Sequence, residues 1–237
     1  AQHHRRAARE IDDGRAGLED ALPFGVLDLT LQPGGLSWAG YRLEQLVPAA
    51  DLRVRGLRNR YRRAGIGAPL VARLEPGQVE NQAAEHRRIP DLVKVPITAF
   101  LRLESPRANL SHGWLAGDLE LYSQDDVLAL DVDGRAWPLE FETSSALAYM
   151  LGDSPWWDFE LAGFFSGAFR PNAERRGADD GLLLVHPYRP GRIPVVLVHG
   201  TASSPARWAD LVNELEIDRE IWDHYQIWLY IYNTGNP

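Results

Sequence analysis

Apolar residues near the C-terminal end of the chain follow the pattern of a buried strand. Four consecutive aliphatic residues, 195–198, are bounded by Pro194 before them and by His199-Gly200 after them. A short uninterrupted apolar run between turn residues is typical of a strand that is covered on both faces, as in a parallel sheet. We therefore predict a strand here that is buried on both faces.

The residues after this run predict a helix and then a second strand. Ser203 or Ser204 is a suitable N-cap, and Pro205 fits the first helical position, where the missing N–H has no cost. Apolar residues then recur at helical spacing, at Trp208, Leu211, Val212 and Leu215. Residues 225–232 predict the second strand. The whole stretch predicts a βαβ unit with two parallel strands, a helix packed across them, and a ligand-binding edge at His199.

The region before residue 178 has the pattern of a β-rich region. Residues 26–31 and 36–43 predict two strands joined as a hairpin through Pro33-Gly34-Gly35. Further strands are predicted at 95–104, 113–122, 127–132 and 136–142, spaced as in a small antiparallel sheet or sandwich. Residues 144–151 predict a short helix. Residues 1–20 are polar and rich in arginine, so we predict a frayed or weakly helical lead-in there.

The acidic residues at 129–140 raise the question of a calcium loop. Asp131, Asp133, Gly134 and Glu140 stand at the third, fifth, sixth and twelfth positions of an EF-hand loop, but Ala129 stands at the first, where a carboxylate is needed. Asp133-Gly134 between two strands is instead the residue pair of a tight hairpin turn. We predict the turn, and we expect neither a metal site nor a cofactor.

Composition and charge limit the classes of function. The chain has no cysteine, which excludes disulfides, thiolate metal sites and a cysteine nucleophile within it. A net charge of −8 argues against a nucleic-acid partner. One segment is nevertheless basic. Its arginines can contact a membrane or another anionic surface, or they can form a solvated face that pairs with acidic residues of the chain: Arg53, Arg55, Arg58, Arg60, Arg62 and Arg63.

The strand and turn at 196–205 resemble a known family. Val-Leu-Val-His-Gly-Thr followed by Ser-Ser-Pro resembles the oxyanion strand and loop of α/β-hydrolases of the esterase and lipase type. The resemblance runs from about Gly181 to Pro237 and covers about a quarter of the chain. It implies an α/β fold in which a β-rich accessory region precedes the first strands of a mostly parallel hydrolase sheet. An ordinary buried strand and turn is the alternative interpretation.

The resemblance also implies an activity and a site. We expect a serine hydrolase acting on an ester or lipid small-molecule substrate, with the N–H of Thr201 in the oxyanion hole and with His199 and Gly200 shaping the turn. No Gly-x-Ser-x-Gly occurs in the chain. We therefore expect the nucleophile, the acid and the catalytic His beyond Pro237, so that neither His186 nor His199 is the base and this segment alone is inactive.

The expected organisation has three parts. Residues 1–22 form the polar lead-in, residues 23–178 the β-rich accessory region, and residues 179–237 the start of an incomplete hydrolase domain. An alternative from another class is a non-catalytic binding or membrane-associated protein that uses the hydrolase fold as a scaffold.

Overall fold

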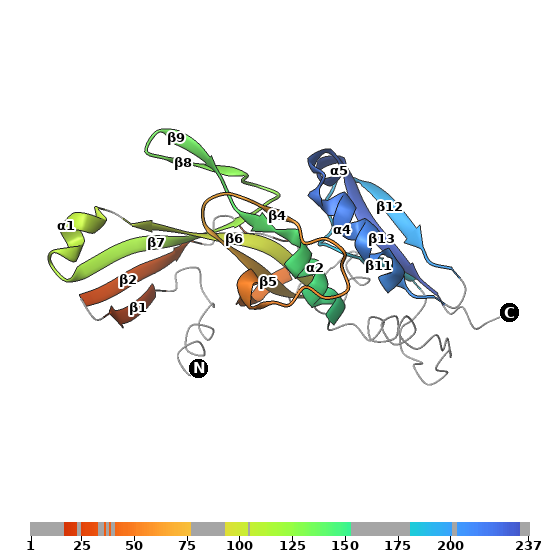
Figure 1. Ribbon diagram of the computed structural model, residues 1–237, viewed down its shortest axis with the longest axis horizontal. Helices are drawn as coiled ribbons and strands as arrows, with labels where there is room; N and C mark the ends of the chain where they lie inside the picture. Colours follow the sequence, from red (N-terminus) through yellow and green to blue (C-terminus); the bar gives the residue numbers. More distant parts are fainter. Residues whose placement is uncertain are drawn as a thin grey trace.

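The computed structural model describes residues 17–22, 25–32, 36, 38, 41–76, 93–103, 105–152, 181–200 and 203–232. The larger sheet extends along the long axis from one end of the molecule, and a smaller sheet with two covering helices lies at the other end (Figure 1). The strand-rich part is formed by the first two thirds of the chain. The mixed α/β content that the sequence predicts is confirmed.

The larger sheet has six strands in the order β1-β2-β7-β6-β5-β3. β2 and β7 run parallel, and the other neighbours are antiparallel. In β7, Leu121 is buried, whereas the carboxylate of the preceding residue, Glu120, accepts a hydrogen bond from Arg102 of β6 at 2.8 Å. The strand bounds are β1 (Gly17–Leu22), β2 (Gly25–Gln32), β3 (Tyr41–Pro48), β5 (Ala68–Pro76), β6 (Val93–Leu103) and β7 (Trp114–Ser123).

Two predictions for the start of the chain are wrong. The hairpin of 26–31 with 36–43 does not form, because β2 pairs with β1 and β7 whereas β3 begins at Tyr41 and pairs with β5 on the opposite edge of the sheet. Part of the polar lead-in is the edge strand β1, which pairs with β2 along its full length. Backbone hydrogen bonds suffice for this, and an edge strand tolerates charged residues such as Glu19 and Asp20. Residues 1–16 lie outside the described part of the chain.

A hairpin extends from the larger sheet above β6. β8 (Ala129–Val132) and β9 (Arg135–Pro138) pair antiparallel around Asp133 and Gly134, whose φ angles are 55° and 75°. Both φ values lie in the left-handed region that a tight hairpin turn of this kind requires. Asp131 accepts a hydrogen bond from the N–H of Gly134 at 3.0 Å, so its carboxylate is used within the turn. The predicted turn is confirmed.

Short elements join the larger sheet to the rest of the molecule. After the 3₁₀ turn η2 (Ala49–Asp51), β4 (Arg62–Arg63) pairs antiparallel with β10 (Phe141–Glu142). The helix α2 (Thr143–Gly152) follows β10 directly and confirms the helix predicted for 144–151. The short helix α1 (Pro106–Leu110) connects β6 to β7 at the far end of the sheet (Figure 1).

The smaller sheet contains the predicted βαβ unit. Its order is β11 (Gly181–Leu184), β13 (Tyr225–Ile231), β12 (Ile193–Val198), with β11 antiparallel and β12 parallel to β13. The connection from β12 to β13 consists of the 3₁₀ turn η4 (Pro205–Trp208) and the helices α4 (Ala209–Ile217) and α5 (Arg219–His224). Val212 of α4 packs with Ile227 and Leu229 of β13 in one cluster. The predicted parallel pair and its packed helix are confirmed.

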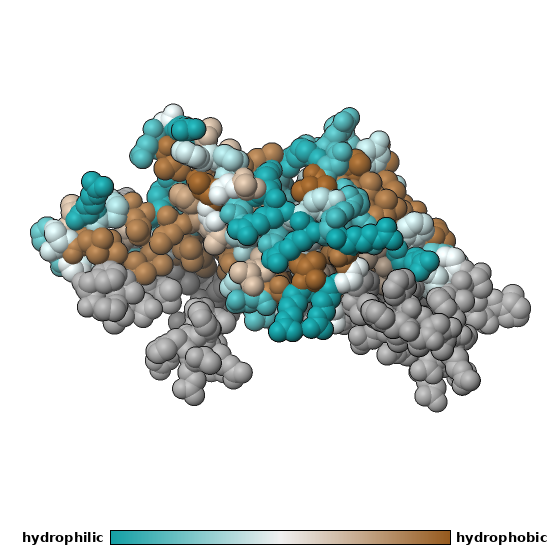
Figure 2. All heavy atoms as spheres, in the orientation of Figure 1, coloured by the Kyte–Doolittle hydropathy of each residue, from teal (hydrophilic) through white to brown (hydrophobic). Residues whose placement is uncertain are grey.

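The prediction that β12 is buried on both faces is wrong. Ile193, Val196 and Val198 are 58%, 43% and 52% exposed, whereas Leu197 packs into the cluster under α4. β12 is the edge strand of its sheet, and no described element covers its second face. Hydrophobic residues accordingly gather at the surface around β12 (Figure 2).

The hydrophobic core is continuous between the two sheets. Leu184 of β11 is buried in the same cluster as Leu74, Val95 and Ile97 of the larger sheet. Leu147 and Leu151 of α2 are in turn buried with Val212 of α4. The parts of the chain before and after the expected boundary near residue 178 therefore contribute residues to the same hydrophobic clusters.

Candidate functional site

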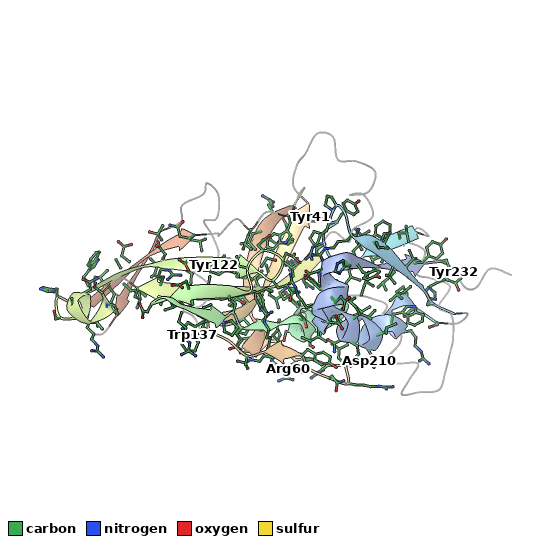
Figure 3. The ribbon with its side chains drawn as sticks, turned by 90° about the horizontal axis from the view of Figure 1, so that it is seen from above. Tyr41, Arg60, Tyr122, Trp137, Asp210 and Tyr232 are labelled. Atoms are coloured by element: carbon green, nitrogen blue, oxygen red, sulfur yellow. The ribbon has the colours of Figure 1, made fainter. Side chains whose placement is uncertain are left out.

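The carboxyl ends of the parallel strands β12 and β13 bring His199 and Tyr232 together. Ligands in open α/β sheets gather at this edge. Val198 of β12 is in register with Tyr230 of β13, so the next residues of the two strands leave the sheet side by side. Figure 3 shows Tyr232 at the end of the smaller sheet, far from Trp137 of β9.

His199 and Tyr232 make two contacts. The hydroxyl of Tyr232 donates a hydrogen bond to the carbonyl oxygen of His199 at 2.6 Å. The two rings are also stacked, with centroids 4.6 Å apart and an angle of 19° between their planes, and Tyr232 stacks in turn on Tyr230 at 5.7 Å. The backbone and the ring of His199 are therefore both held from β13.

His199 is buried, with 4% of the residue's surface exposed, and only one of its ring nitrogens has a described partner. Nδ1 lies 3.1 Å from the carbonyl oxygen of Gly200, which can only accept, so Nδ1 carries the proton in this bond. In the neutral imidazole Nε2 is then an acceptor, and Nε2 has no partner among the residues that the structure describes. The neighbouring ring of Tyr232 covers one face of the imidazole.

The predicted site residues have different outcomes. His199 and Gly200 lie at the turn after β12, at the expected edge of the sheet. Thr201, the predicted oxyanion donor, lies outside the described residues. The chain is described again from Ser203. Ser204 takes the predicted N-cap position with extended backbone and Pro205 opens η4, but the Ser204 side chain makes no capping hydrogen bond. The helical periodicity from Trp208 onward is confirmed as η4 followed by α4.

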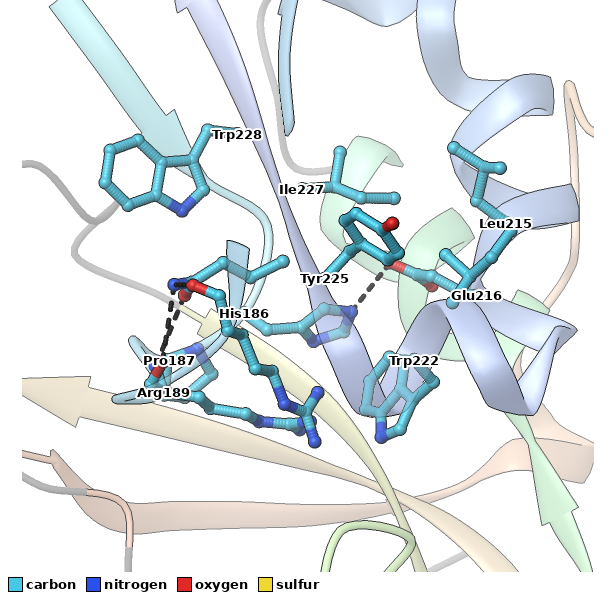
Figure 4. A pocket seen from close by; sticks show the side chains of 12 residues that line it. His186, Pro187, Arg189, Leu215, Glu216, Trp222, Tyr225, Ile227 and Trp228 are labelled. Atoms are coloured by element: carbon cyan, nitrogen blue, oxygen red, sulfur yellow. Dashed lines mark hydrogen bonds and ion pairs between the residues drawn. The ribbon is translucent and has the colours of Figure 1, made fainter. Parts of the chain in front are cut away.

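A second polar cluster lies at the opposite ends of β12 and β13. Nε2 of His186 and a carboxylate oxygen of Glu216 in α4 are 2.7 Å apart (Figure 4). The ring of Trp222 in α5 lies beside this pair and meets the His186 ring edge-on, at 73° between the ring planes. The volume between these side chains that the centre of a water molecule can occupy is only about 20 Å³, which is enough for one or two waters. An ester substrate does not fit, so this cluster is not a substrate pocket in the structure.

Asp125 connects this second cluster to the larger sheet. It follows β7 and accepts a hydrogen bond from Nε1 of Trp222 at 2.7 Å, and it forms an ion pair with Arg189. Burial lowers the pKa of Arg189 to about 10, although the Asp125 carboxylate acts in the opposite direction. A guanidinium buried against its carboxylate and the Trp222 ring holds the two parts of the molecule together.

Most arginines of the basic segment bind other residues of this chain. Arg60 pairs with the buried Glu142, Arg62 with Glu140, and Arg58 with Asp210 at 3.2 Å. Arg63 lies over the ring of Phe141 and donates to the Leu139 carbonyl at 3.3 Å. Arg58, Arg60 and Arg62 therefore pair with acidic residues of the chain, as one of the two interpretations of this segment expects, whereas Arg63 contacts a ring and a backbone carbonyl. Arg53 and Arg55 are exposed, and within the described part of the chain they have no partner.

Sequence reasoning missed the role of Tyr232 and the pairing of His186 with Glu216. The tyrosine had a local signal, because Tyr230 and Tyr232 alternate at the end of an apolar strand. The His186–Glu216 pair had none, because its members are 30 residues apart and meet only when α4 crosses the sheet.

Within the described ranges, no group of three or more histidine, aspartate or glutamate side chains is arranged to hold a metal ion. No helix in these ranges has both the length and the apolar character needed to cross a membrane. Comparisons with protein-family models, with curated proteins and with solved structures find no match to this chain.

Proposed function

We propose that this chain is the N-terminal part of a serine hydrolase acting on carboxylic esters, and that the turn after β12 supplies the oxyanion hole. One observation carries the proposal. β12 and β13 run parallel in register, α4 packs across them, and the His-Gly turn leaves the carboxyl end of β12. In esterases and lipases that the motif resembles, this arrangement binds the oxyanion.

In the proposed reaction, a serine attacks the ester carbonyl and its oxygen becomes negative. The N–H of Thr201 donates a hydrogen bond to this oxygen, and the loss of one such donor lowers kcat by about 100-fold to 1000-fold. His199 and Gly200 fix the direction of the chain that leads to this N–H. The nucleophile, the acid and the catalytic His belong, in this proposal, to residues after Pro237.

The exposed edge of β12 also supports the proposal. Its outer face carries Val196 and Val198, and its outer backbone groups face no other described strand. A mostly parallel hydrolase sheet would continue at this edge, and the added strands and their helices would cover both valines. The antiparallel β11 would then be an edge strand of a larger mixed sheet.

The experiment uses the full-length protein and two variants of one residue. Thr201→Pro removes the backbone N–H, whereas Thr201→Ala keeps it and serves as the matched control. We expect hydrolysis of p-nitrophenyl butyrate and labelling by a fluorophosphonate in the wild type. We expect a loss of about 100-fold or more in kcat for Thr201→Pro, with less than about tenfold for Thr201→Ala.

Circular dichroism and thermal unfolding check that both variants fold. A folded Thr201→Pro protein with wild-type kcat would remove Thr201 from the oxyanion hole. A full-length protein that hydrolyses no ester and takes up no fluorophosphonate would disprove the proposed activity.

A non-catalytic, membrane-associated protein is the second candidate. Arg53 and Arg55 favour it, because both guanidinium groups are exposed and lack partners among the described residues. Absence of esterase activity together with binding to anionic vesicles would support this function.

A further inference from the structure

We infer that Tyr232 is a positioning residue for the oxyanion turn, and that its hydroxyl, in addition to its stacked ring, holds the turn in place. This inference rests on the proposed function. Tyr232 follows directly on β13, so the element beside the oxyanion strand would set the geometry of the turn.

The hydrogen bond acts on the peptide group that begins the turn. The carbonyl of His199 and the N–H of Gly200 belong to one planar unit, so fixing the carbonyl direction also fixes the N–H direction. The Tyr232 hydroxyl lies 2.6 Å from that carbonyl oxygen. The chain toward Thr201 therefore starts from a peptide plane with a set orientation.

Apart from its two chain neighbours, no residue in the described part of the chain packs closely against Gly200. A Cβ built at this position would meet none of their atoms within 4 Å. Glycine has the widest choice of backbone angles, so an unsupported turn at Gly200 would sample several conformations. The described contacts that restrain the turn are the Tyr232 hydrogen bond, the ring stack on His199 and the internal bond from Nδ1 to the Gly200 carbonyl.

Tyr232 is itself held in a defined position. Its ring stacks on Tyr230, and Tyr230 is paired in register with Val198 of β12. The hydroxyl thus reaches the turn from a strand that is hydrogen-bonded to the oxyanion strand. A donor displaced by about 1 Å can lose about 100-fold in rate, so a support of this kind matters for the reaction.

The test compares three variants of the full-length protein. Tyr232→Phe removes the hydroxyl and keeps the stacked ring. Tyr232→Ala removes both. Tyr230→Phe is the matched control, because the structure gives the Tyr230 hydroxyl no part in holding His199.

Two measurements are made on each variant: kcat and KM for p-nitrophenyl butyrate, and amide hydrogen exchange in the peptide that covers residues 199–203. For Tyr232→Phe we expect kcat to fall about tenfold to 100-fold, with KM changed by less than about twofold, because a donor to the oxyanion acts in the transition state. We expect exchange in 199–203 to become at least about tenfold faster. Tyr230→Phe should leave both readouts unchanged.

The outcomes separate this inference from the proposed function. An active wild type with unchanged kcat and exchange in Tyr232→Phe overturns the inference and leaves the function standing. A Tyr232→Phe protein that fails to fold also overturns it, because the bond is then needed for the strand itself. If the wild type hydrolyses no ester, the proposed function fails. If, in addition, Tyr232→Phe has the same amide exchange in 199–203 as the wild type, the hydroxyl does not hold the turn either.

Discussion

The hydroxyl of Ser144 in α2 donates a hydrogen bond to Oδ1 of Asn213 in α4 at 2.7 Å, and both residues are almost completely buried. The same hydroxyl accepts the N–H of Tyr61 at 2.7 Å, and Nδ2 of Asn213 donates to the carbonyl of Asn59 at 2.9 Å. Four residues from three separate segments therefore satisfy one another's hydrogen-bond donors and acceptors where the strand-rich part meets the smaller sheet.

This network predicts that Ser144→Ala destabilises the whole molecule. The substitution leaves the Tyr61 N–H without its acceptor and Oδ1 of Asn213 without its donor, and a buried group without a partner costs about 1–3 kcal/mol. Urea unfolding should show a single transition whose free energy falls by about that amount. Ser111→Ala is the control, because the Ser111 hydroxyl is exposed and its removal should change the free energy by less than about 0.5 kcal/mol. Two separate transitions would show that the parts fold independently.

The membrane hypothesis now depends on Arg53 and Arg55. Arg58, Arg60 and Arg62 are held in ion pairs, so changing them would disturb the fold as well as any surface contact. We expect Arg53→Ser with Arg55→Ser to weaken binding to vesicles containing phosphatidylserine at low salt, and to change binding little at 0.5 M salt. Co-sedimentation measures this.

Arg107→Ser, at an exposed arginine of α1, is the control for the loss of one positive charge elsewhere on the surface. Equal vesicle binding by the wild type and the double variant at low salt would argue against a membrane role for this segment.

The pair formed by Tyr61 and Glu214 predicts a pH-dependent part of the stability. Hydrogen bonds from Tyr61 and from Asn59 lower the pKa of Glu214 below its ordinary value of 4.5, and the bond to Glu214 raises the pKa of Tyr61 above 10. Because Glu214 binds its proton less readily in the folded state, its contribution is present above about pH 4.5 and is lost as the pH falls through its folded pKa. Because Tyr61 keeps its proton more readily in the folded state, its contribution is lost as the pH rises through its folded pKa.

We therefore expect the stability difference between the wild type and Glu214→Gln to be largest between about pH 5 and pH 9 and to shrink toward pH 3. Urea unfolding at several pH values measures it. Glu220→Gln also replaces a carboxylate by an amide, at an exposed position of α5, and serves as the control. A difference between wild type and Glu214→Gln that stays constant down to pH 3 would contradict the prediction.

The uncovered edge of β12 predicts self-association of the 237-residue chain. An edge strand with unpaired backbone groups and exposed valines is a template for pairing with another strand. We expect light scattering after gel filtration to detect oligomers, and we expect Val196→Lys to shift the population toward monomers because the charge blocks close pairing. Val26→Lys, on an exposed valine of β2, is the control. Oligomers that persist unchanged in Val196→Lys would place the association elsewhere.

Local signals in the sequence were sufficient for the βαβ unit and for the β8–β9 turn. The aliphatic run between Pro194 and His199 is long enough only for a short strand, and Pro205 with the helical spacing after it defines where the next helix starts. Asp133-Gly134 takes the left-handed backbone angles that a tight hairpin turn needs. In each case the residues that carry the signal are neighbours along the chain, so the sequence alone determined the element.

Tertiary contacts decided the rest. The pattern at 26–31 predicted a strand but not its partners, because β2 is paired with β7, which begins more than 80 residues later. The four aliphatic residues of β12 looked the same as a strand covered on both faces, but no described element packs on the face that carries Val196 and Val198. The hydroxyl of Tyr232 became a partner of His199 only because β13 lies beside β12. Pairing across the chain depends on which surfaces meet, and that information is shared between distant residues rather than contained in any one segment.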